Sequence, residues 1–344
     1  MDVLKAPRVC GVSALQLLNL LSYLAFVFSS AIGGAGLFGV PRIGDTSNAL
    51  PVQTTPAGYA FSIWSLIFVL LGILTLLQML PVNREWSASR LGLWWVVNAG
   101  ICEALWPFAF VYRWGGMWVS AALLGLIVAT AAGLYLQMRS GVAPLSDARA
   151  PPSKAPPSAL NLLHRPSPAV SLVESLLCQG GVAIYMGWTS CAFILNVSIA
   201  LSQSGVGTTK DVVATASAAV LTAAAIVAMC GALTRTDWMF AGAISWALAA
   251  IHVNQLRPGF VSPRAVLDAS LATAVLAGAA AALALLWRVG MLATGRLALA
   301  PLALALGGEE FKGGVEQRHA AAGRAAWAAD QQQAVVTENV VAWK

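Results

Sequence analysis

Residues 57–80 read AGYAFSIWSLIFVLLGILTLLQML and contain no charged side chain. A helix needs about 20 mostly apolar residues to cross the hydrocarbon core of a bilayer. Because no water is present there to satisfy peptide groups, such a run has to be helical. It is also too long for a membrane β-strand and lacks the alternation of one. The stretch therefore predicts a membrane-spanning helix.

Seven further runs have the same character, so the sequence predicts an all-α polytopic membrane protein with eight spans. The first and fifth runs are long enough to tilt or to extend beyond the bilayer, and the seventh is the shortest. The predicted spans are Val12–Val40, Ala57–Leu80, Leu91–Tyr112, Gly116–Met138, Ala169–Leu201, Val212–Leu233, Trp238–Gln255 and Ala265–Leu292.

The composition supports this class and excludes others. The 344 residues are 58% hydrophobic and 10% charged, whereas soluble chains average about 25% charged residues. The net charge is +6, but the basic residues are scattered between apolar runs and do not form the basic patch of a nucleic-acid-binding protein. The five cysteines include no CxxC pair and the three histidines are far apart, so neither a disulfide framework nor a metal site is expected. No motif requires a cofactor, and we assign no catalytic residue.

The chain divides into four predicted parts. Residues 1–11 form an N-terminal segment, and residues 12–201 contain the first five spans. Within that part, residues 139–168 hold seven of the 16 prolines and predict a solvated linker. Residues 202–300 contain three additional spans, and residues 301–344 form a polar tail.

The basic residues also predict the orientation. Fifteen lysines and arginines fall on the face that carries both termini, and five fall on the other face. Because cytosolic loops of membrane proteins are enriched in basic residues, we expect both termini in the cytosol, and the membrane itself is left open.

Two ordered polar-aromatic strings lie in the second and fifth predicted spans. In the fifth, spacings of three, four and four residues put four side chains on one helix face, namely Tyr185, Trp188, Ala192 and Asn196. In the second, Phe61, Trp64 and Phe68 form a similar stripe. Facing each other, the two stripes would line an apolar slot with flat walls, which is typical of a small-molecule site.

The strings resemble the TspO/MBR family, the tryptophan-rich sensory proteins that include the mitochondrial translocator protein. The fifth helix of that family carries Tyr-x-x-Trp-x-x-x-Ala-x-x-Leu-Asn, which residues 185–196 match at every position. The second-helix string matches from Trp64 onward, and the residues before it, with Tyr59, resemble longer members that read AGYAFSIW. The resemblance covers residues 12–201 and implies a TspO-like five-helix bundle, to which about three helices are added.

The third helix of the family has Asn-x-x-Trp, and two registers fit it here. Asn98 is followed by Ile101 where the tryptophan belongs, whereas Glu103 precedes Trp106 at the correct spacing but replaces the asparagine. Both registers stay open. A carboxyl group in mid-span is costly, so Glu103 is either a proton-linked or ligand-contacting group or a protonated residue bonded to a neighbouring helix.

The resemblance implies a small hydrophobic ligand, a tetrapyrrole such as haem or protoporphyrin or a sterol-like compound, bound for sensing, carriage or transport. Two alternatives are a proton-coupled secondary transporter of another solute and a porphyrin-degrading membrane enzyme. The other partner is the lipid bilayer, without nucleic acid, and the chain is either a monomer or a homo-oligomer. The candidate ligand-binding residues are Tyr59, Phe61, Trp64, Phe68, Asn98, Glu103, Trp106, Tyr185, Trp188, Ala192 and Asn196.

Overall fold

The computed structural model describes residues 8–9, 12–80, 91–139, 179–205, 210–235, 237–258 and 263–293, and the structural statements below concern these residues. All of them belong to one compact unit that comprises residues 1–299, and a second unit of residues 300–344 lies outside them. Most of the predicted N-terminal segment, nearly all of the predicted linker and the whole predicted tail are therefore outside the described residues.

Each of the eight predicted spans contains helix. The helices are α1 Ala14–Ala35, α3 Ile63–Gln78, α5 Gly92–Trp95 continued by the π-helix η5 Val96–Glu103 and by α6 Ala104–Val111, α7 Trp118–Arg139, α8 Gly180–Gln203, α9 Lys210–Arg235, α10 Trp238–Gln255 and α11 Arg264–Ala293. The shorter elements are the antiparallel strands β1 Arg8–Val9 and β2 Val12–Ser13, the helix α2 Ile43–Asn48 and the 3-10 turns η2 Leu37–Gly39, η3 Gly58–Ser62 and η6 Trp114–Met117.

The ends of α1 show how the sequence sets a helix boundary. Ser13 caps the helix and forms a reciprocal capping box with Gln16. Gly36 ends it in the left-handed conformation, at φ 71°, which glycine adopts without steric cost. The predicted first span ran on to residue 40, but the helix stops at Ala35 because of this glycine.

Seven helical segments among the described residues are long and apolar enough to cross a membrane. The helix α10 has the bounds of the predicted seventh span but is not one of the seven. Its last turn contains His252, Asn254 and Gln255, which lower its mean hydropathy. The total of eight spans stays a prediction, as does the orientation of the termini.

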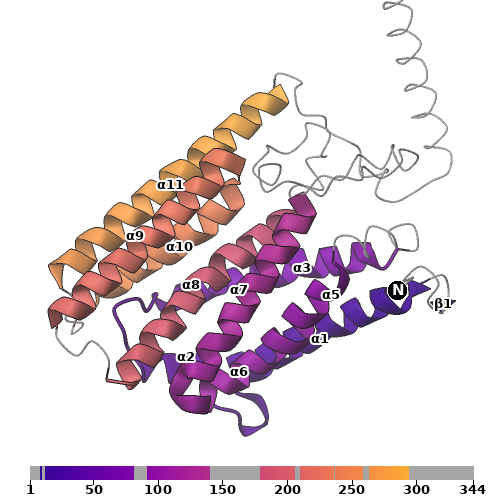
Figure 1. The fold of residues 1–344 in the computed structure, drawn as a ribbon, viewed down its shortest axis with the longest axis horizontal. Helices are drawn as coiled ribbons and strands as arrows, with labels where there is room; N and C mark the ends of the chain where they lie inside the picture. The colour runs from indigo at the N-terminus through magenta and orange to yellow at the C-terminus, as the bar shows by residue number, and fades with distance from the viewer. Residues whose placement is uncertain are drawn as a thin grey trace, which may run out of the picture. The chain divides into compact units, whose positions relative to one another are not determined.

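The helix α8 connects the two parts of the bundle. It packs against α7 and α3 from the first five spans and against α10 from the last three. Figure 1 shows α9, α10 and α11, drawn in orange, as a group of three neighbouring helices with α10 facing α8. On the other side of the bundle, α1 contacts α3, η5 and α6.

Buried polar groups hold α1 against its neighbours. The Gln16 amide nitrogen donates to the carbonyl of Gln78 at 2.5 Å, and the Gln78 amide returns a bond to the Gln16 carbonyl at 3.0 Å. One turn further, Trp95 Nε1 donates to the carbonyl of Asn19 at 3.0 Å. Hydrogen bonds of this kind join helices in lipid, where a hydrophobic driving force between them is missing.

The backbones of α8 and α10 approach closely at a glycine. A Cβ atom added to Gly187 would lie 2.8 Å from the carbonyl oxygen of Phe240 and 3.0 Å from Cβ of Ala243. Backbone atoms cannot move aside as a flexible side chain can, so the contact requires glycine. Small residues at helix crossings are the usual means of close packing in membranes.

We expect Gly187→Ala to lower the melting temperature of the purified protein in detergent, because the added methyl group separates α8 from α10. The matched control is Gly242→Ala on α10, where a new Cβ meets no atom within 4 Å. Both changes raise helix propensity by about 1 kcal/mol, so the control should melt at the same or a higher temperature. Equal melting temperatures for the two variants would contradict the close crossing.

Candidate functional site

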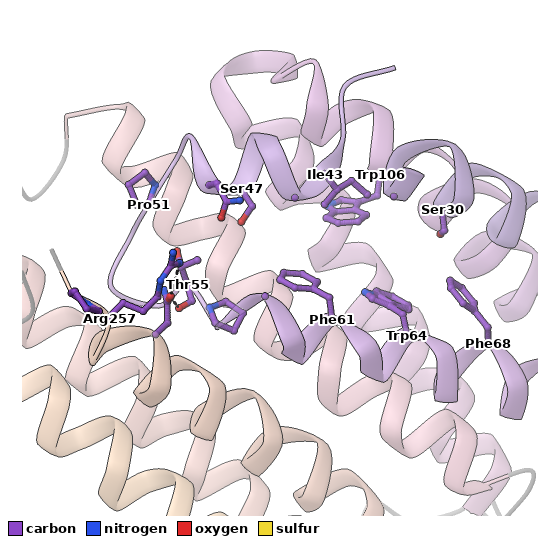
Figure 2. A pocket seen from close by; sticks show the side chains of 17 residues that line it. Ser30, Ile43, Ser47, Pro51, Thr55, Phe61, Trp64, Phe68, Trp106 and Arg257 are labelled. Atoms are coloured by element: carbon purple, nitrogen blue, oxygen red, sulfur yellow. Dashed lines mark hydrogen bonds between the residues drawn. The ribbon is translucent and has the colours of Figure 1, made fainter. Parts of the chain in front are cut away.

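A cavity of about 1000 Å³ lies between α1, α3, α6 and the residues that link α1 to α3. Its long wall is aromatic. Phe61 on η3 and Trp64 and Phe68 on α3 follow one another along one face, and the Trp64 and Phe68 rings are stacked with centroids 5.5 Å apart. Figure 2 shows these three rings facing Trp106 and Ile43 across the cavity.

The opposite end of the cavity is polar. Ser47 from α2, Thr55 from the linking segment and Asn254 and Arg257 from the end of α10 line it. Asn254 Nδ2 donates to the carbonyl of Thr55 at 3.0 Å, and Arg257 Nη1 donates to Asn254 Oδ1 at 3.3 Å. The ends of two distant segments therefore meet at this part of the wall.

The helix α10 also fixes the linking segment that forms the floor of the cavity. The Ala57 amide donates to the carbonyl of Ala250 at 2.9 Å, and Trp246 Nε1 donates to the carbonyl of Ala60 at 3.0 Å. Tyr59, a candidate ligand contact, is about half exposed and its ring packs edge-on against Trp246, with centroids 5.4 Å apart. The structure places Tyr59 outside the cavity lining, in the contact with α10.

The candidate residues on α8 lie behind the cavity wall. Trp188 is buried and packs edge-on against Phe61 and Trp64, with centroids 5.6 and 6.5 Å away. Asn196 accepts a bond from Ser120 Oγ at 2.6 Å and ties α8 to α7, and Ala192 is half-buried beside it. The slot expected between the second and fifth spans is thus filled by side chains. The cavity instead has its second wall on α1, α2 and α6.

Three candidates form a buried polar cluster, namely Asn98, Glu103 and Tyr185. Tyr185 Oη lies 2.6 Å from Asn98 Oδ1 and 2.7 Å from Glu103 Oε1. The Asn98 amide nitrogen donates to the carbonyl of Ile127, so its oxygen has to face Tyr185. One hydroxyl proton cannot serve two acceptors. Tyr185 therefore donates to Asn98, and the contact with Glu103 requires a proton on the carboxyl group.

The backbone of the third span explains how the side chains of both Asn98 and Glu103 reach Tyr185. Asn98 and Glu103 are five residues apart, which in an α-helix would turn them to different faces. Residues 96–103 form a π-helix, whose wider turn and i→i+5 hydrogen bonds bring residues five apart closer to the same side. Pro107 then leaves the carbonyl of Glu103 without its α-helical donor, and Ser29 Oγ, whose shorter bond is to the Phe26 carbonyl at 3.0 Å, lies 3.4 Å from it.

Comparison with known protein families gives one result over most of the chain. A family model described as TSPO-like protein matches residues 16–287.

The chain belongs to the TSPO-like family. Together with the seven apolar helices, this membership makes it a multi-pass integral membrane protein of the TspO family. The match extends beyond the five spans that carry the motifs and includes α9, α10 and most of α11. No curated protein and no solved structure matches the chain.

The residues of the two possible registers of the TspO third-helix motif lie partly in the cavity wall and partly in the buried polar cluster. Trp106, in the second register, lines the cavity, whereas Ile101, in the first, is exposed. Asn98 and Glu103 both contact Tyr185, because the π-helix accommodates the extra residue between them.

Several lining residues of this TspO-family protein were not among the candidates. They come from α1, from the segment between α1 and α3 and from the end of α10, and include Ser30, Gly34, Ile43, Ser47, Pro51, Thr55, Asn254 and Arg257. The sequence contained a signal for one of them. Arg257 is a basic residue next to a predicted span, on the membrane face that carries few basic residues. The others lie on α1, α2 and α10 or in the segment before η3, and their partners across the cavity are distant in sequence.

We expect Tyr185→Phe to lower the melting temperature in detergent, because it leaves Asn98 and Glu103 buried without their shared partner. An unsatisfied buried polar group costs about 1–3 kcal/mol. Tyr112→Phe, at the exposed end of α6, is the matched control and should melt like the unaltered protein. If both variants melt alike, the cluster contributes nothing to stability.

Proposed function

We propose that the cavity binds a planar, mostly apolar small molecule of the tetrapyrrole or sterol-like class, for sensing, carriage or transport. The observation that carries the proposal is the row of three aromatic rings along a cavity of about 1000 Å³. Small-molecule sites are apolar concave spaces of about 300–1,000 Å³ with a few polar groups. A row of aromatic side chains along one wall favours a flat ligand with its own π-system, so we place tetrapyrroles before sterols.

An unpartnered donor in the wall supports the same proposal. Trp106 lines the cavity and is 9% exposed, and its indole N–H has no hydrogen-bond partner in the structure. Buried polar groups are nearly always paired in native proteins, so an unpaired one needs an explanation, and a bound ligand would supply one for Trp106. A pyrrole nitrogen or a carboxyl oxygen of a bound molecule is a suitable acceptor.

The test is titration of protoporphyrin into the purified protein, followed through the porphyrin absorption band so that removal of a tryptophan does not remove the signal. We expect Trp64→Ala to weaken binding by about 5- to 150-fold, because stacking on an aromatic side chain is worth about 1–3 kcal/mol. Trp287→Ala, on the exposed part of α11, should leave the affinity unchanged.

Melting temperatures of the same preparations separate binding from packing. If Trp64 only packs the bundle, Trp64→Ala lowers the melting temperature and leaves the affinity of the folded fraction unchanged. That result, or the absence of binding in the unaltered protein, would count against the site.

A second candidate function is proton-coupled transport, and the buried Glu103 favours it. Ionisable groups inside a membrane bundle commonly belong to proton relays, and Glu103 is a buried carboxyl group in contact with Tyr185. In proteoliposomes with an imposed pH gradient, we expect protoporphyrin uptake to follow the gradient and Glu103→Gln to remove that dependence. Uptake that is indifferent to the gradient, or equally sensitive in Glu103→Gln, would leave binding alone as the function.

A further inference from the structure

The two ends of the cavity differ in chemistry. Phe61, Trp64 and Phe68 form the aromatic wall, and Figure 2 shows Arg257 and Thr55 at the other end from Phe68. Among the described residues that line the cavity, Arg257 carries the only charge. A flat molecule lying along the aromatic wall would therefore point one edge toward a guanidinium group.

The side chain of Arg257 is exposed and is joined to the cavity wall by a hydrogen bond. Its Nη1 donates to Asn254 Oδ1, and Asn254 is buried and anchored by its own bond to the carbonyl of Thr55. Within the described part of the chain, Arg257 forms no salt bridge, and the next arginine along the sequence, Arg264 at the start of α11, pairs with Asp268. The bond to Asn254 occupies one of the five guanidinium N–H groups, so a fork of donors stays free for an anion.

We propose that Arg257 binds a carboxylate on the edge of the planar ligand, and that Asn254 is the positioning residue for it. The inference rests on the proposed function of the cavity and adds a ligand class, namely planar molecules with at least one carboxylate at one edge. Arginine suits this task because its planar fork matches the two oxygens of a carboxylate. Arg257 directly follows α10, so the last three spans would help to determine which ligands the aromatic wall accepts.

The experiment compares protoporphyrin, which has two carboxylates, with its dimethyl ester, which has the same ring and no negative charge. Both are titrated into the full-length protein in nanodiscs of zwitterionic lipid. We expect Arg257→Gln to weaken binding of the diacid roughly tenfold and to leave the ester unaffected, because hydrogen bonds to charged groups exceed neutral ones by about this factor. Arg257→Lys should retain much of the diacid affinity.

The control is Arg264→Gln, which changes an exposed arginine at the start of α11 that does not line the cavity, and it should bind both porphyrins like the unaltered protein. An equal loss for diacid and ester in Arg257→Gln, or no loss for either, would overturn the carboxylate assignment while the proposed function stands. If the unaltered protein binds neither porphyrin, the proposed function fails and this inference fails with it.

A lipid headgroup is a different source of the same negative charge. The titrations are therefore repeated in nanodiscs that contain phosphatidylglycerol. An effect of Arg257→Gln that occurs only with this lipid would assign the arginine to the membrane surface and overturn the proposal. An effect on the diacid in both lipids supports it.

Discussion

The segment between α1 and α3 needs hydrogen-bond partners for a backbone that is not helical, and α10 supplies them. Peptide groups away from water have to be paired, and irregular backbone at membrane depth is tolerated only where protein or a water-filled cavity surrounds it. The amide of Ala57 and the carbonyls of Thr55 and Ala60 bond to α10. The direction in which the chain enters α3, and with it the placement of the aromatic row, depends on these bonds.

The packing of α8 explains why the cavity does not lie between the second and fifth spans, where the two aromatic strings of the sequence would place it. Because α8 lies directly against α3 and α10, its tryptophan fills the space between them. The open space is left on the side of α3 that faces α1 and α6. Trp188 thus acts on the cavity through Phe61 and Trp64, whose rings it supports from behind.

Much of this arrangement could be predicted from the sequence, and the rest has identifiable physical reasons. Long apolar runs predicted the helices of all eight spans but not the short helix α2, and the spacing of Phe61, Trp64 and Phe68 predicted a shared face that does line the cavity. Helical spacing says which residues share a face but not which neighbour that face meets, so Tyr185 and Asn196 on one face contact different helices. Asn254 and Thr55 are 199 positions apart, and no local pattern connects them.

The polar last turn of α10 has a consequence for how the protein is made. A helix enters the bilayer from the translocation channel according to its own apolarity, and α10 is less apolar than its neighbours. Its buried residues face α8, α9 and α11 rather than lipid. We therefore expect α10 to insert together with the flanking helices as a group. The floor of the cavity then forms only after α11 has left the ribosome, so a chain truncated before α11 would contain all the aromatic residues of the wall without the segment that orients them.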